Sequence, residues 1–319
     1  MPLLDDPANH LPTVAEVDAA IAVRARPTAG GQGVALLVVS TLLFVGAQRT
    51  FSDAPMTHIG LLVAVLLLHE LGHLLAMRLF GFKDLRMFFI PFFGAAAAGH
   101  KLDATGAQRA IVALAGPLSG LVLAFALMFG LAFSDVEVGP TLTEFIGLLL
   151  VLNFFNLLPM VPFDGGRFVN LVIFSRWPTA EQLFRLAAGA GMIWLAYALT
   201  SWVLGIVGGF VLLGAGLAAK IGRVGQILRA QHPPPRPTAV LDTSPEFRAR
   251  MIEELAPLIV RPGAPHATTV KLFAMYLRGG WDRAIDAPPG PVASAALLLV
   301  YLAFVGVGVA LYLKLPADL

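Results

Sequence analysis

Two histidines and a glutamate interrupt a long run of leucines in LLLHELGHLL, residues 66–75. On a helix, His69 and His73 are four residues apart and lie on one face, about a turn from each other. Both imidazoles can then reach the same metal ion, and Glu70 is close enough to touch a water molecule on it. H-E-x-x-H on a helix is the pattern in which two histidines bind zinc and the glutamate acts as a general base. The stretch therefore predicts a hydrolytic metal centre.

A structural role is the alternative interpretation of the same residues. Polar side chains in a membrane bundle can simply hydrogen-bond a neighbouring helix. We favour the metal site because burying His69, Glu70 and His73 within about one turn is costly unless a cation compensates them. The chain contains no cysteine, so thiolate ligands, disulfides and cysteine nucleophiles are excluded. Any metal must be held by histidine, aspartate or glutamate.

A catalytic zinc ion needs a third protein ligand and an open position for water. Two candidates are His100, which ends an interrupted apolar segment, and Asp164, in NLLPMVPFDGGR at 156–167. Prolines disrupt the helix before Asp164, and Gly165 and Gly166 allow the tight backbone that an ion-facing carboxylate needs. Taken alone, the DGG sequence is equally consistent with a turn at the membrane edge.

Depth in the membrane supports Asp164 as the third ligand. Counted at 1.5 Å per residue, His69 and His73 lie about 18 and 24 Å into a hydrocarbon layer about 30 Å thick. Asp164 follows an apolar span that runs in the same direction and ends near the same face. The levels agree within one or two helical turns.

The composition indicates a membrane protein. Of the 319 residues, 57% are hydrophobic and 13% charged, with a mean hydropathy of +0.79, whereas ordinary soluble domains have about 25% charged residues. The first residues are polar and acidic, unlike a secretory signal peptide, so we expect the mature chain to begin at Met1. The net charge is +2, and no basic face with interleaved aromatic residues predicts nucleic-acid binding.

Seven segments are long and apolar enough to be transmembrane helices. They lie at 33–50, 58–80, 109–133, 142–162, 183–200, 203–222 and 292–313. The fifth and sixth are nearly continuous, so we predict an all-α polytopic membrane protein with about six or seven transmembrane helices. Between the second and third, MFFIPFFGAAAAGH at 87–100 is apolar but interrupted by proline and glycine. It predicts a re-entrant loop or a β-hairpin.

The distribution of lysine and arginine predicts the orientation of the chain, because positive charge in short loops remains cytoplasmic. Basic residues precede the first span, flank 87–100, and follow the fourth and sixth spans, whereas the loop at 134–141 has none. We expect a cytoplasmic N-terminus, an external C-terminus and a site nearer the cytoplasmic face. The predicted location is the cell membrane of a bacterium or archaeon.

HELGHLLA at 69–76, together with N-x-x-P and DGGR within 156–167, resembles the site-2 protease family of intramembrane zinc metalloproteases. The resemblance covers roughly residues 58–175. AGPLSG at 115–120 is similar to the small-residue motif of the family's intervening span, although we favour close helix packing as its role. The sequence shows no PDZ-like or CBS-like insertion of the kind that family members often carry.

The resemblance implies specific roles for the candidate residues. His69, His73 and Asp164 would bind Zn2+, Glu70 would be the catalytic base, and Asn156 would bind the substrate or stabilise its oxyanion. The implied activity is hydrolysis of a peptide bond within or near the transmembrane segment of a single-span membrane protein in the lipid bilayer. Two rivals are a membrane metal transporter and a catalytically inactive, membrane-binding relative.

Four regions are expected on this basis. Residues 1–32 form a cytoplasmic segment, and residues 33–230 form a transmembrane protease domain with its core at about 58–175. Residues 231–290 form a cytoplasmic linker and small helical region, which a regulatory partner would bind, and residues 291–319 form a C-terminal transmembrane helix.

The predicted cytoplasmic region opens with a semi-rigid spacer, QHPPPRPT at 231–238. A helix is expected to begin at Ser244 and Pro245. A second is expected around 268–278, ending at Gly279 and Gly280.

Overall fold

The computed structural model describes residues 11–24, 32–101, 104–134, 137–231, 239–260, 263–285 and 288–312. The chain divides into two compact units. The small unit comprises Met1–Pro27 and Leu213–Ala287, and the large unit comprises Thr28–Leu212 and Pro288–Leu319. The N-terminal segment and the predicted cytoplasmic region therefore contribute to one unit, and nearly all of the predicted proline spacer lies outside the described residues.

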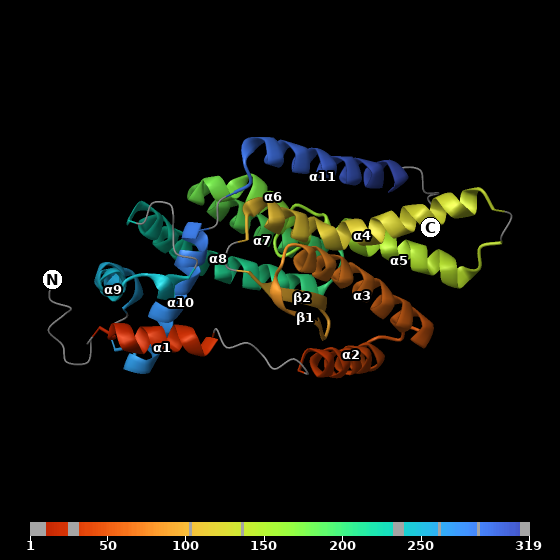
Figure 1. Ribbon diagram of the computed structural model, residues 1–319. Coiled ribbons are helices and arrows are strands. Elements are labelled where there is room, and N and C mark those ends of the chain that lie inside the picture. The colour runs from red at the N-terminus through yellow and green to blue at the C-terminus, as the bar shows by residue number, and fades with distance from the viewer. Residues whose placement is uncertain are drawn as a thin grey trace. The chain divides into compact units, whose positions relative to one another are not determined.

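The large unit is built from apolar helices (Figure 1). They are α2 (Gln32–Phe51), α3 (Met56–Leu79), α4 (Gly106–Ala132), α5 (Pro140–Asn156), α6 (Asp164–Val172), α7 (Pro178–Ala198), the first part of α8 (Trp202–Gln231) and α11 (Pro291–Tyr312), with a short 3-10 turn, η2 (Phe174–Arg176). Each of the seven predicted spans contains a helix, although the fourth is helical only as far as Asn156. In the described part of the chain, five helices are long and apolar enough to cross a membrane: α2, α3, α4, α8 and α11. These helices make the chain a multi-pass membrane protein.

Small residues allow α3 and α4 to approach closely. A Cβ on Gly72 of α3 would collide with the Ala115 carbonyl and the Ser119 hydroxyl of α4. The Ser119 hydroxyl also lies 3.3 Å from the Leu68 carbonyl, to which it donates a hydrogen bond. Small residues at such a contact are typical of membrane helix pairs. The AGPLSG motif therefore brings the backbone of α4 directly against α3.

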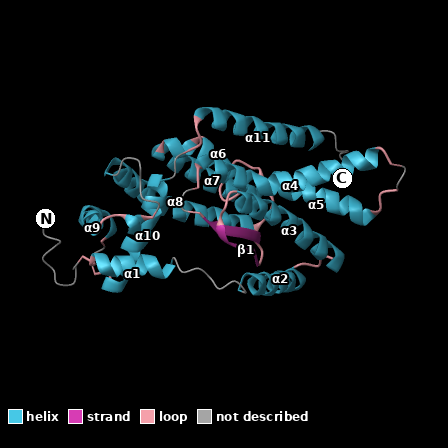
Figure 2. Cartoon of the chain, in the orientation of Figure 1, coloured by secondary structure: helices cyan, strands magenta, loops and turns pink. Residues whose placement is uncertain are grey.

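The interrupted apolar segment, predicted as a re-entrant loop or a β-hairpin, forms a β-hairpin, drawn in magenta in Figure 2. Strand β1 (Lys83–Ile90) pairs antiparallel with β2 (Gly94–His100). Phe92 and Gly94, at the turn, have positive φ angles of 68° and 100°. Glycine adopts such an angle without steric cost. On the outer edge of β1, the Phe89 N–H donates a 2.9 Å hydrogen bond to the Ser40 hydroxyl of α2.

The fourth predicted span ends earlier than expected. Its helix, α5, stops at Asn156 rather than at residue 162, because Pro159 cannot continue a helix and disfavours helical backbone in the residue before it. The DGG sequence is also more regular than a turn, since Asp164 is the first residue of helix α6.

Gly165 and Gly166 are needed at the start of α6 for space rather than for an unusual backbone angle. A Cβ on Gly165 would collide with the Leu157 carbonyl, and one on Gly166 would collide with the backbone of Met160.

The small unit is a helical cluster. It contains α1 (Val14–Arg24), the last part of α8, a 3-10 turn η3 (Val240–Asp242), α9 (Pro245–Ile259) and α10 (His266–Ile285). The predicted start of α9 is confirmed, because the Ser244 hydroxyl accepts a 3.2 Å hydrogen bond from the Phe247 N–H. Its core includes Met251, Leu255, Phe273, Leu277 and Trp281.

Two features of the small unit differ from the sequence-based expectation. The predicted end of α10 at Gly279 and Gly280 is wrong, since the helix continues to Ile285. The continuation buries Trp281 in the core, so tertiary packing outweighs the low helix propensity of two glycines. The N-terminal helix α1 was not expected, and it is held to α9 by a 2.9 Å ion pair between Asp18 and Arg248.

Candidate metal centre

The H-E-x-x-H residues lie on the buried side of α3. His69, Glu70 and His73 retain only 3%, 5% and 7% of their accessible surface, so three ionisable groups are removed from solvent within little more than one turn. In the described part of the chain, their ligand atoms form a group of potential metal donors within 4.8 Å of one another.

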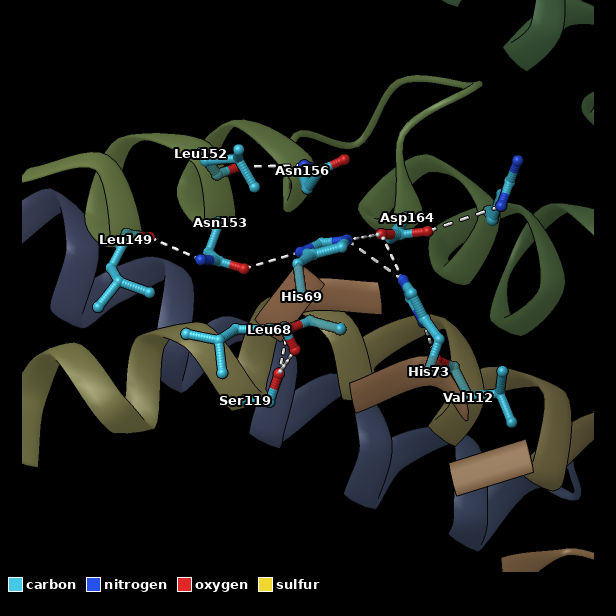
Figure 3. Close-up of polar contacts among 12 residues, drawn as sticks. Leu68, His69, His73, Val112, Ser119, Leu149, Leu152, Asn153, Asn156 and Asp164 are labelled. Carbon is cyan, nitrogen blue, oxygen red and sulfur yellow. Dashed lines mark hydrogen bonds and ion pairs between the residues drawn. The ribbon is translucent and has the colours of Figure 1, made fainter. Parts of the chain in front are cut away.

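Asp164 is distant from these residues in the sequence but lies at the same point in the structure. Its Oδ2 atom lies 3.0 Å from His69 Nε2 and 3.1 Å from His73 Nε2, and the two Nε2 atoms are 3.2 Å apart (Figure 3). The carboxylate is buried at the start of α6. Arg167, one turn later, is largely exposed and lies 3.7 Å from the other carboxylate oxygen, too far to be a strong partner.

The outer nitrogens of both histidines face hydrogen-bond acceptors. His69 Nδ1 lies 2.8 Å from Asn153 Oδ1, and the Asn153 amide is oriented by donating from Nδ2 to the Leu149 carbonyl at 2.7 Å. His73 Nδ1 lies 2.7 Å from the Val112 carbonyl. Each Nδ1 therefore carries a proton and donates it. In the neutral imidazole, the Nε2 lone pair then remains free.

Two imidazole lone pairs and one carboxylate oxygen consequently converge on a single point. Without a cation they would repel one another in an apolar interior. Atoms bound about 2.0–2.1 Å from a tetrahedral zinc ion lie about 3.3 Å from one another, close to the three observed separations. The donor set of His69, His73 and Asp164 therefore fits Zn2+ with three protein ligands and one open position. Hydrogen bonds from the outer histidine nitrogens to fixed acceptors are the usual support for such ligands.

Two glycines of α4 create the space for this arrangement. A Cβ on Gly116 would overlap the His73 ring, and a Cβ on Gly120 would overlap the Asn153 amide. The same helix supplies the Val112 carbonyl that holds His73. The AGPLSG segment thus does more than pack, because it forms the wall against which the ligand His73 and the Asn153 amide that supports His69 lie.

The other two candidates lie differently. Asn156 is half-buried and donates a 3.1 Å hydrogen bond to the Leu152 carbonyl of its own helix. No hydrogen bond among the described residues joins it to His69, His73 or Asp164. His100 is exposed at the end of β2 and is not in the cluster of potential metal donors.

Asn153 is the functional residue that sequence analysis missed. It is fully buried within the apolar helix α5. An amide in such a place is costly unless it is hydrogen-bonded, and that cost was the available signal. The family motif matches Asn156, three residues later, so the resemblance implied a role for Asn156 and none for Asn153.

The geometry defines a metal site carried by helices of a multi-pass membrane protein. Comparison with known proteins finds similarity to zinc metalloproteases. Residues 57–145 match the model of peptidase family M50. A zinc metalloprotease of Methanocaldococcus jannaschii is 29% identical over 177 residues, which cover 53% of this chain and 51% of that protein. Stage IV sporulation protein FB of Bacillus subtilis is 31% identical over 169 residues, which cover 53% of this chain and 58% of that protein.

A solved site-2 protease from Methanocaldococcus jannaschii matches with 25% identity and a TM-score of 0.41, covering 57% of this chain and 89% of that one. The chain spans about half the length of the curated relatives described above. The match to peptidase family M50 and the similarity to zinc metalloproteases confirm the resemblance that the sequence motifs indicated.

We predict that replacing the two asparagines of α5 has different effects on zinc affinity. Asn153→Ala removes the acceptor that orients His69 and should weaken zinc binding by about 10- to 100-fold, the usual effect of losing such a partner. Asn156→Ala should leave zinc affinity unchanged, because Asn156 bonds only to its own helix. Zinc affinity is measured by competition with a chromophoric chelator on the detergent-purified protein. Equal affinities for the two variants would contradict the assigned role of Asn153.

Proposed function

We propose that the protein is an intramembrane zinc metalloprotease that hydrolyses a peptide bond within or near the transmembrane segment of a single-span membrane protein. The observation that carries the proposal is the convergence of His69, His73 and Asp164 on one point, with the Glu70 carboxylate beside it on a helix long enough to span a membrane. The M50 match over residues 57–145, which contain His69, Glu70 and His73, supports peptide hydrolysis as the chemistry.

The roles of the metal ligands and of Glu70 are assigned from their positions, and the role of Asn156 from its match to the family motif. Zn2+ would be held by His69, His73 and Asp164, and when bound it supplies Lewis-acid polarisation of the scissile carbonyl and lowers the pKa of water. Glu70 accepts a proton from the attacking water molecule while the water oxygen bonds to the carbonyl carbon of the substrate. Glu70 then returns the proton to the amide nitrogen as the C–N bond breaks. Asn156 donates from its amide to the carbonyl oxygen, where negative charge develops.

The β-hairpin is proposed to hold the substrate in an extended form. Strand β2 runs alongside α3, with Gly94 beside Leu66 and Gly99 beside Met77. Glu70 lies between these points, and its carboxylate interacts electrostatically with the backbone N–H of Ala97. The free edge of β2 therefore faces the metal centre.

The hydrogen-bonding phase of the hairpin identifies which groups lie on that edge. Phe89 donates to Ser40 and not to β2, so its partner Ala95 belongs to a pair that is not hydrogen-bonded across the strands. The N–H and C=O groups of Ala95 consequently point outward, as do those of Ala97 two residues later. A peptide unwound from its helix can add to this edge as a third strand.

Orientation and regulation are part of the same proposal. The positive-inside pattern supports a cytoplasmic N-terminus and a site nearer the cytoplasmic face of a bacterial or archaeal cell membrane. The small unit is proposed to receive a regulatory partner. Metal transport is less well supported, because the potential metal donors found among the described residues of the large unit form one cluster instead of following a path.

Replacing Glu70 tests the proposed chemistry. Glu70→Gln should retain zinc, because Glu70 is not a ligand, and should lower the cleavage rate by about 10²- to 10⁴-fold, the usual contribution of a general base. Cleavage of single-span substrates in detergent and zinc content are both measured. Glu253→Gln, an exposed position of α9, is the matched control and should behave as the wild type. A fully active Glu70→Gln protein would overturn the assignment.

The strand-addition step is tested at Ala95. Ala95→Pro removes an outward N–H without removing a bond of the hairpin ladder, so cleavage should fall at least tenfold, for a loss of about 1.4 kcal/mol per lost hydrogen bond, while zinc content is unchanged. Ala95→Ser keeps the N–H and serves as the control. If zinc and cleavage were lost together, the hairpin would have a structural role only.

A further inference from the structure

A tyrosine far from the motifs contacts both segments that carry the metal site. Tyr301 of α11 is buried, and its hydroxyl donates a 2.6 Å hydrogen bond to the carbonyl of Leu157, the residue immediately after α5. Its ring stacks on Phe168 of α6 with a centroid separation of 5.1 Å. One side chain therefore joins the end of the asparagine-bearing helix to the helix that begins with Asp164.

The Leu157 carbonyl needs this partner. It belongs to the last turn of a helix, where carbonyls have no bonding partner within the helix, and Leu157 is buried in an apolar cluster with Phe168 and Tyr301. Water is not available there to replace a missing donor. The Tyr301 hydroxyl is the hydrogen-bond donor that the described structure provides for it.

The position of Asp164 depends on the same carbonyl. Gly165, the residue after Asp164, lies so close to the Leu157 carbonyl that no Cβ would fit between them. Phe168 lies four residues after Asp164 and hence on the same face of α6, one turn away. A shift of the Leu157 carbonyl or of the Phe168 ring would therefore move the first turn of α6 and, with it, the carboxylate.

A second tether holds α11 beyond the other end of α6. The Arg176 guanidinium, in the turn after α6, donates hydrogen bonds of 2.7 Å to the Pro289 carbonyl and 2.8 Å to the Ser294 hydroxyl. Ser294 lies in the first turn of α11 and its hydroxyl donates to the same Pro289 carbonyl. Helix α11 is thus fixed to both ends of the short helix that presents Asp164.

We propose that Tyr301 is a positioning residue for the metal site: through Leu157 and Phe168 it sets α6 so that Asp164 reaches His69 and His73. The inference rests on the metal centre of the proposed function, but not on proteolysis itself. Tyr301 is not among the proposed ligands or catalytic groups. Its removal should therefore weaken zinc binding by Asp164 and leave the catalytic groups intact.

The test compares zinc release by wild type and Tyr301→Phe, which keeps the ring stack and removes only the hydroxyl. Zinc-loaded protein in detergent is mixed with an excess of a chromophoric chelator, and the rate of transfer is recorded. Tyr301→Phe should release zinc about tenfold faster, the lower end of the effect of removing a residue that orients a ligand. Its cleavage rate should return toward the wild-type value when zinc is in excess.

Two controls separate positioning from general loosening. Phe304→Leu lies on the same helix and disturbs the stack of Phe304 on Phe125 of α4, so it lowers stability while keeping the Tyr301 hydroxyl and the Tyr301–Phe168 stack. Tyr197→Phe changes the same chemical group at an exposed position of α7. Both variants should release zinc at the wild-type rate, with thermal unfolding of the metal-free proteins measured alongside.

The outcomes distinguish the inference from the function on which it rests. Wild-type release by Tyr301→Phe, or equally fast release by Phe304→Leu, would overturn the positioning role. If the wild type cleaves substrate, failure of excess zinc to restore cleavage by Tyr301→Phe would overturn it as well. A wild-type protein that binds no zinc would overturn the proposed function together with this inference. A protein that binds zinc, loses it faster in Tyr301→Phe and cleaves no substrate would overturn proteolysis alone and support the positioning role.

Discussion

The structure depends on a single electrostatic constraint: three electron-pair donors meet in an apolar interior and require a positive charge between them. The Nδ1 protons of His69 and His73 are already committed to the Asn153 amide and the Val112 carbonyl. No proton therefore remains on the inner nitrogens of the neutral rings to bond the Asp164 carboxylate. A shared cation satisfies all three groups at once, which explains why such costly residues are buried together.

Close backbone approach is the means by which the fold meets this constraint. On one side, Gly116 and Gly120 leave room for the His73 ring and the Asn153 amide. On the other, Gly165 and Gly166 allow the start of α6 to lie against the loop that follows α5. Because packed interiors yield little, an added methyl group at these positions would be felt by the ligands directly. The small residues near the site are therefore as necessary to its geometry as the ligands themselves.

Sequence reasoning reached the parts of the site that local patterns encode. His69 and His73 are paired by the helical period alone. Prolines indicated a disrupted helix before the ion-facing Asp164, although the span itself was predicted to continue to residue 162. The hairpin was anticipated, without its register, from the proline and glycines of an apolar segment. These signals act within a few residues, so a single chain displays them.

The remaining features arise from contacts between distant segments. Asn153 gains its role only when α5 lies beside α3, and Tyr301 only when α11 lies beside α6. Helix α10 runs through two glycines because burial of Trp281 compensates their poor propensity. Which partner a buried polar or aromatic residue meets is fixed by tertiary packing, which periodicity does not specify.

Zinc K-edge X-ray absorption on the purified protein and on Asp164→Ala tests the central claim most directly. We expect two imidazole nitrogens and a carboxylate oxygen at about 2.0–2.2 Å from the ion in the wild type, and loss of the carboxylate with the two imidazoles retained in the variant. A wild-type spectrum without two imidazole ligands, or the same spectrum for both proteins, would contradict a site shared by His69, His73 and Asp164.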